Sequence, residues 1–130
     1  MKKVLFVCVE NAGRSQMAEG FFRKLSPNGY EGTSAGTKPV SEINPLVIKA
    51  MKEVDIDISH NKSKLVTTEM ISESDSVVNM GCMDMESCPA LFVENVPDWG
   101  IEDPKGKPIE DVRRIRDSIE IKVKELVSDL

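Results

Sequence analysis

Residues 4–20 read VLFVCVENAGRSQMAEG, an apolar run followed by a tight arc and then by a helical pattern. The run 4–7 predicts a buried strand that ends at Cys8, and helical spacing begins directly after Arg14-Ser15. A strand, a short loop and a helix bring unpaired backbone N–H groups to one spot, which the helix dipole makes positive. This stretch therefore predicts an oxyanion-binding loop.

Three side chains of this loop carry candidate chemistry. We expect Cys8 to be a thiolate nucleophile, because backbone dipoles and a cation surround it. The planar guanidinium of Arg14 can bind two oxygens of a tetrahedral oxyanion, and Ser15 can hold the leaving sulfur. A lone cysteine at a strand end is more often a small buried hydrophobe, but the strand, glycine and helix around this one favour catalysis. The expected substrate-binding residues are Val9, Glu10, Asn11, Ala12, Gly13 and Arg14.

The composition predicts a single globular domain over residues 1–130. A net charge of −5 argues against a nucleic-acid surface. No apolar segment is long enough to span a membrane and no signal peptide is evident, so we expect a cytoplasmic protein. Three cysteines are too few for a secreted disulfide framework and favour catalytic or redox roles. With one histidine, no metal site is expected.

Strand and helix patterns alternate along the remaining chain. Strands are expected at 30–34 and 76–80, with a fourth at 96–99, where Pro97 indicates an edge or short strand. Expected helices begin at Asn44-Pro45, cover 67–72 and fill roughly the last twenty residues. This order predicts an α/β fold with a four-stranded parallel sheet that has helices on both faces.

Candidate chemical groups follow three of the expected strands. Cys8 ends the first, Cys82 comes just after the third, and Asp103 lies beyond the fourth. Ligand chemistry in parallel sheets gathers at the carboxyl ends of the strands. We therefore expect these residues to meet at one edge of the sheet. Cys88 lies in the polar stretch after Cys82, and the alternative is that both later cysteines are buried and inert.

Five segments together resemble one protein family. The chain is similar to the low-molecular-weight tyrosine phosphatase superfamily and, within it, to the thioredoxin-coupled arsenate reductases. The resemblance implies a low-molecular-weight phosphatase-like fold in which Asp103, in an Asp-Pro turn, is the general acid. From the residues alone, Asp98 and Glu102 are alternative acids, and Asp103 can instead serve only to shape the turn. The matching segments are 4–20, 33–39 (TSAGTKP), 44–59 (NPLVIKAMKEVDIDIS), 82–89 and 99–107 (WGIEDPKGK).

The resemblance implies two alternative functions that share the loop. A tyrosine or aryl phosphatase needs Cys8, Arg14 and Asp103. An arsenate reductase also uses Cys82, which attacks the Cys8 sulfur, and Cys88, which completes a final Cys82–Cys88 disulfide. Its substrate is arsenate, with phosphate and sulfate as mimics. No cofactor is bound, and an external dithiol protein such as thioredoxin restores the thiols. Weak phosphatase activity is compatible with either function, and we expect a monomer.

A potassium site is a further implication. Some reductases that resemble this chain hold the ion beside the loop with an Asn, a Glu, a Ser and an Asp. Asn11, Glu19 and Ser34 match, whereas Lys64 stands at the Asp position. Its ammonium group is a candidate substitute for the ion. The alternative is that Asn11 and Ser34 only brace the loop through hydrogen bonds.

Overall fold

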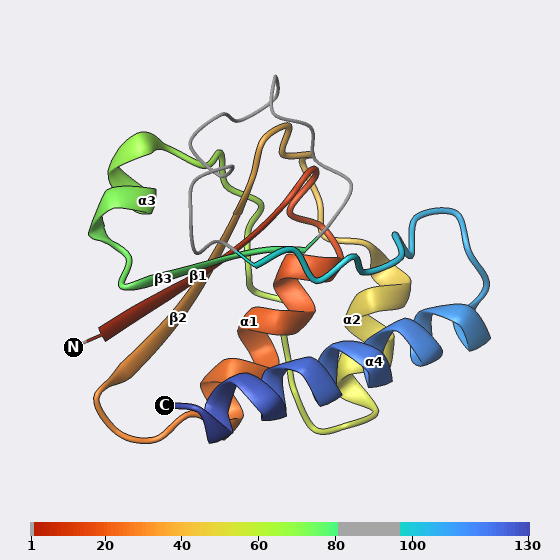
Figure 1. Ribbon diagram of the computed structural model, residues 1–130. Coiled ribbons are helices and arrows are strands. Elements are labelled where there is room, and N and C mark those ends of the chain that lie inside the picture. Colours follow the sequence, from red (N-terminus) through yellow and green to blue (C-terminus); the bar gives the residue numbers. More distant parts are fainter. Residues whose placement is uncertain (1, 81–96) are drawn as a thin grey trace.

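The computed structural model describes residues 2–80 and 97–130, and it places three parallel strands at the centre of the fold (Figure 1). The central strand is β1 (Lys2–Cys8), flanked by β2 (Tyr30–Gly36) and β3 (Ser76–Asn79). In the register, Cys8 pairs with Gly36 and Val7 pairs with Asn79. The three strands therefore end at one edge, as the α/β prediction requires.

The predicted strand at 96–99 is not formed as a strand in the part of the chain that the structure describes. Asp98 makes an isolated parallel bridge to Asn79. The Asn79 N–H donates to the Pro97 oxygen at 3.0 Å, and the Trp99 N–H donates to the Asn79 oxygen at 2.9 Å. Pro97 has no N–H to donate to a neighbouring strand, so it cannot continue the ladder. Val96 lies outside the described residues. Within residues 2–80 and 97–130, the prediction of four strands is thus corrected to three strands, and the predicted fourth strand is reduced to the bridge at Asp98.

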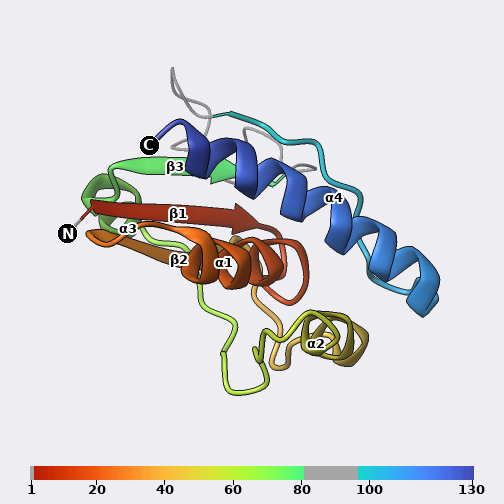
Figure 2. The ribbon, with the colours of Figure 1, turned by 90° about the horizontal axis from the view of Figure 1, so that it is seen from below.

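Helices lie on both faces of the sheet, as predicted. Helices α1 (Arg14–Leu25), α2 (Pro45–Lys52) and α4 (Ile109–Ser128) lie on one side, and the short α3 (Thr68–Glu73) lies on the other (Figure 1). Seen from below, α1 and α4 run across the sheet and α2 packs toward the end where β1 stops (Figure 2). None of the helices within residues 2–80 and 97–130 has the length and apolar character needed to cross a membrane.

The two faces of β1 belong to separate apolar clusters, because alternate side chains of a strand point to opposite faces. Phe6 and Cys8 join the larger cluster under α1, α2 and α4. Leu5 and Val7 join a smaller cluster beneath α3. All four are at most 2% exposed. Cys8 therefore lies at the end of the buried part of β1, on the helix-rich side.

Helix ends follow the predicted signals. The Asn44 side chain caps α2 by accepting from the Leu46 N–H at 3.0 Å, with Pro45 in the first turn. Thr67 caps α3 by accepting from the Met70 N–H. The N-terminal cap of α1 is Gly13, and no side chain caps this end. Gly13 thus offers no side-chain oxygen to the first turn of α1, at the end of the helix where an oxyanion is expected.

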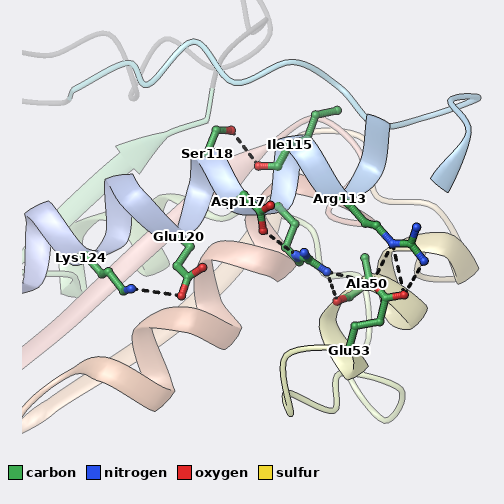
Figure 3. Close-up of polar contacts among 9 residues, drawn as sticks. Ala50, Glu53, Arg113, Ile115, Asp117, Ser118, Glu120 and Lys124 are labelled. Atoms are coloured by element: carbon green, nitrogen blue, oxygen red, sulfur yellow. Dashed lines mark hydrogen bonds and ion pairs between the residues drawn. The ribbon is translucent and has the colours of Figure 1, made fainter. Parts of the chain in front are cut away.

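Glu53, at the end of α2, holds that helix to α4 (Figure 3). Its carboxylate accepts from Arg113 Nη2 at 2.7 Å and from Arg116 Nη1 at 2.9 Å. These arginines lower the pKa of Glu53 from 4.5 to about 2, with the Arg113 hydrogen bond as the main cause. The carboxylate therefore links the end of α2 to α4.

Replacing Glu53 with Gln is expected to lower Tm by a few degrees at pH 7. Because folding depresses the pKa of Glu53, its stabilising effect is present above pH 4.5 and is lost as the pH falls toward 2. Thermal unfolding by circular dichroism from pH 2 to 7 should show the wild type and E53Q converging at the acid end. The control is Glu120→Gln, which removes an ion pair to Lys124 within α4 and should change Tm less. Equal Tm values for E53Q and the wild type at pH 7 would contradict the role of Glu53.

Candidate active site at the carboxyl end of β1

Cys8 lies at the end of β1 and is 2% exposed. Its sulfur accepts the Asn11 N–H at 3.2 Å and lies 2.8 Å from Ser15 Oγ. The Ser15 oxygen also accepts from Asn11 Nδ2 at 2.7 Å, and its own hydrogen is available to the sulfur when Cys8 is a thiolate. The Asn11 N–H and the Ser15 hydroxyl can then both donate to Sγ, an arrangement that suits a thiolate.

Asn11 shapes the loop 8–14 from within. Its φ of 52° lies in the left-handed region, which Asn tolerates better than most residues. Its side-chain oxygen accepts from the Lys64 N–H at 2.9 Å and from Gln16 Nε2 at 3.2 Å. Its backbone oxygen accepts from Ser63 Oγ at 3.0 Å. These hydrogen bonds connect Ser63 and Lys64 through Asn11 to Ser15, as a residue that braces the loop would do.

The loop carbonyls are engaged by the segment that follows β2. The Cys8 and Val9 oxygens accept N–H groups from Thr37 and Lys38, and the Ala12 oxygen accepts from Asn44. Through these carbonyl oxygens the loop is bound to the 37–44 segment. Other backbone N–H groups, such as that of Asn11, point into the loop, where the Asn11 N–H meets the Cys8 sulfur. Loop N–H groups of this kind form anion-binding concavities.

Arg14 and Asp103 meet beside the sulfur. Arg14, 3% exposed, begins α1 and donates through Nη1 to the Ile101 oxygen at 3.0 Å. Its Nη2 lies 3.8 Å from Asp103 Oδ2, and the Asp103 side chain is 51% exposed. The guanidinium is thus fixed between the loop and the segment that carries the expected acid, while that acid stays open to solvent.

A cavity of about 260 Å³ contains the predicted groups. Cys8, Arg14 and Asp103 line it together, although Asp103 is far away in the sequence. The convergence predicted for this edge is therefore found for the described residues. Cys82 and Cys88 lie outside the described residues. Among the described residues, the cavity is lined by Cys8, Glu10, Ala12, Gly13, Arg14, Val40, Glu42, Asn44, Asp103, Pro104 and Lys105.

The alternative acids are placed differently. Glu102 pairs with Arg114 and Lys107, and the Arg114 hydrogen bond is the main cause that lowers its pKa. Asp98 accepts the Gly100 N–H at 2.9 Å in a turn outside the cavity lining. Asp103 accepts the Lys105 N–H at 3.0 Å, so it does shape its turn, but it also lines the cavity. Of the three, the geometry favours Asp103 as the acid.

Sequence reasoning missed Gln16 and gave no role to Lys105. Gln16 is fully buried, and its Nε2 donates to the Asn11 backbone oxygen at 3.1 Å while its Oε1 accepts from Asn61. The only sequence signal was a polar residue on the apolar face of α1. Lys105 reaches back to Glu10 in the loop, and no local pattern indicates that contact.

A buried polar network lies behind the loop. Glu19, 1% exposed, accepts from Ser34 Oγ at 3.2 Å and from Asn61 Nδ2 at 3.1 Å, and Arg23 lies 3.8 Å from its carboxylate. Lys64 reaches Asn11 through its backbone N–H, and the residue as a whole is exposed. Ser34 therefore donates its hydrogen bond to Glu19 rather than to the loop. That the Lys64 ammonium group takes the place of a potassium ion stays a prediction.

Gly36 should tolerate no side chain. A Cβ there would lie 2.5 Å from the Val9 oxygen and 2.9 Å from the Asn11 nitrogen. We expect Gly36→Ala to displace the loop, to destabilise the fold by about 1–3 kcal/mol and to lower kcat/KM roughly 10²-fold. Urea unfolding and steady-state kinetics measure both effects. Gly29→Ala is the control, because its φ of 94° makes it strained but nothing lies within 4 Å; it should lose stability only. Unchanged kinetics in G36A would contradict the contact.

The fold and this site define an α/β protein with a cysteine-based oxyanion loop. Residues 3–130 match the family described as low molecular weight phosphotyrosine protein phosphatase. The chain belongs to this family. The resemblance stated from the motifs is thereby confirmed over nearly the whole chain.

Individual relatives include reductases and a phosphatase. An arsenate reductase of Staphylococcus aureus (strain N315) is 40% identical over 124 residues, covering 94% of this chain and 93% of the relative. A solved arsenate reductase in the phosphate binding state has a TM-score of 0.87 at 35% identity, with 99% and 98% of the two chains covered. The YwlE arginine phosphatase from Geobacillus stearothermophilus has a TM-score of 0.84 at 30% identity, with 99% and 92% covered.

Proposed function

We propose that the protein reduces arsenate to arsenite through a covalent adduct on Cys8. The observation that carries the proposal is the buried Cys8 sulfur, which contacts the Asn11 N–H and the Ser15 hydroxyl in a cavity that Arg14 and Asp103 also line. Arg14 would bind two arsenate oxygens. Asp103 would give its proton to the oxygen that leaves as water when the sulfur attacks arsenic. The naming of relatives at 35–40% identity as arsenate reductases supports this choice of substrate.

The two electrons that arsenic needs come from thiols. The Cys82 thiolate attacks the Cys8 sulfur, the As–S electron pair leaves with arsenite, and a Cys8–Cys82 disulfide remains. Cys88 then attacks Cys82, which frees Cys8 and forms the Cys82–Cys88 disulfide. A dithiol protein of the thioredoxin type takes over the oxidation by exchange. This scheme uses all three cysteines of the chain, requires no bound cofactor, and suits a monomer in a reducing compartment such as the cytoplasm.

The second candidate is a phosphatase that uses Cys8, Arg14 and Asp103 alone. The family match favours it, and the same cavity would bind a phosphoryl group. The residue after Pro104 is Lys105, however, where the resemblance implies that phosphatases carry a Tyr to stack on a phenol. Two cysteines would also be left without a role.

Replacing Cys82 with Ser separates the two candidates. Arsenate-dependent oxidation of reduced thioredoxin should fall to the background rate in C82S, because the adduct on Cys8 has no thiol to release it. Hydrolysis of p-nitrophenyl phosphate should persist, since it needs only the loop and the acid. Thioredoxin oxidation that continues unchanged in C82S would exclude the cascade. Wild type that hydrolyses the aryl phosphate but never oxidises thioredoxin would establish the phosphatase.

A further inference from the structure

An ion pair connects the loop 8–14 to the turn 103–106. Lys105 Nζ lies 2.7 Å from Glu10 Oε2, and both residues line the active-site cavity. The hydrogen bond that Lys105 donates to Glu10 is the main cause that raises the pKa of Lys105, and the charge of Asp103 adds to it. The lysine is therefore charged at neutral pH, and it neutralises a carboxylate of the loop that binds the oxyanion.

The pair lies at the outer part of the cavity. The Cys8 and Arg14 residues are 2% and 3% exposed, whereas the Glu10 and Lys105 side chains are 28% and 68% exposed. Exposure thus rises from the nucleophile toward the ion pair, which places the pair at the mouth. A molecule that reaches the sulfur must pass these two side chains or the wall opposite them.

The turn is fixed to the loop by two further contacts. Pro104 is buried and lies so close to Gly13 that a Cβ there would meet its ring carbon at 2.9 Å. Asp103 lies 3.8 Å from Arg14. Three consecutive turn residues therefore contact three residues of the loop. The Lys105 contact is the most exposed of the three, and the other two do not involve the Lys105 side chain.

We propose that the Glu10–Lys105 ion pair is a specificity determinant that favours a compact tetrahedral oxyanion over an aryl-substituted one. The proposal deepens the proposed function, on which it rests. Lys105 acts by cancelling the Glu10 charge, which would otherwise repel a dianion at short range. The joined side chains also narrow the mouth, so a ring attached to the oxyanion has less room than a bare ion.

Binding measurements test this without any turnover. Dissociation constants for inorganic phosphate and for phenylphosphonate would be measured by calorimetry for the wild type, K105Q and E10Q/K105Q. In K105Q the Glu10 carboxylate is left uncompensated, so both constants should rise about two- to fivefold, the scale of an exposed charge interaction. In E10Q/K105Q the repulsion is gone, so phosphate should return to within about twofold of the wild type. Phenylphosphonate should then bind more tightly than to the wild type, because the mouth is open.

The matched control is Lys107→Gln. Lys107 pairs with Glu102 at 3.5 Å, just beyond the same turn, but does not line the cavity, and both constants should be unchanged. Phosphate binding that stays weak in E10Q/K105Q would mean that Lys105 contacts the anion directly, which overturns the proposal. An unchanged ratio of the two constants in the double variant would overturn it as well. Failure of arsenate reduction would appear only in the thioredoxin assay, so the two failures are distinguishable.

Discussion

Cys8→Ser is expected to abolish both arsenate-dependent thioredoxin oxidation and aryl phosphate hydrolysis. Loss of a covalent nucleophile lowers turnover by roughly 10⁴-fold or more. A serine hydroxyl at this position would keep its proton, because an alcohol is a much weaker acid than a thiol and neither group that contacts this atom, the Asn11 N–H or the Ser15 hydroxyl, is a base. They stabilise an anionic sulfur but offer no base to activate an alcohol. Steady-state assays of both reactions measure the effect.

The variant should still fold and bind oxyanions. Serine is close to cysteine in size, and the contacts of Arg14 with Ile101 and Asp103 do not involve the sulfur. Calorimetry with phosphate should therefore give a dissociation constant near that of the wild type. Iodoacetamide provides a second measurement, since it should modify Cys8 of the wild type at neutral pH and phosphate should protect the thiol. Turnover retained in C8S, or a sulfur that is sluggish toward iodoacetamide, would contradict the role of Cys8 as nucleophile.

The sequence predicted those parts of the fold that depend on local patterns. Strand patterns that alternate with helix patterns predicted the parallel sheet. The side chains of Asn44 and Thr67 indicated helix starts that the structure confirms. The fourth strand was wrong within the described residues. The missing N–H of Pro97 limits pairing more than an edge strand would require, and the segment pairs with β3 through a single bridge between Asp98 and Asn79. Whether an apolar segment completes a ladder depends on its neighbour, which local patterns do not reveal.

The candidate site divides in the same way. Cys8, Arg14 and Ser15 were identifiable because strand, loop and helix signals lie within one continuous stretch. Asp103 could be placed at the same edge because sheet topology brings strand ends together. The Glu10–Lys105 contact joins residues 95 positions apart, and side-chain pairing over that distance leaves no spacing to detect. The role of Gln16 could not be predicted either, because its hydrogen bond to the Asn11 backbone oxygen depends on the left-handed conformation of Asn11.

Asp103→Asn is expected to lower kcat about 10²- to 10⁴-fold, the range for a general acid. This substitution isolates proton transfer, because the side-chain oxygen of asparagine can still accept the Lys105 N–H that Asp103 Oδ1 accepts at 3.0 Å. The turn should therefore persist while the proton donor is lost. Leaving-group dependence gives a specific signature. Across aryl phosphates, kcat of D103N should decline steeply as the leaving group becomes more basic, whereas the wild type should change little.

Asp98→Asn is the matched control for this prediction. Asp98 makes the same kind of turn, accepting the Gly100 N–H at 2.9 Å, but it does not line the cavity. We expect D98N to keep the kcat of the wild type and its weak leaving-group dependence. If D103N instead behaved like D98N in both respects, Asp103 would serve only to shape its turn. Because Glu102 is held by Arg114 and Lys107, the proton would then have to come from solvent, and the close approach of Asp103 to Arg14 would have no catalytic meaning.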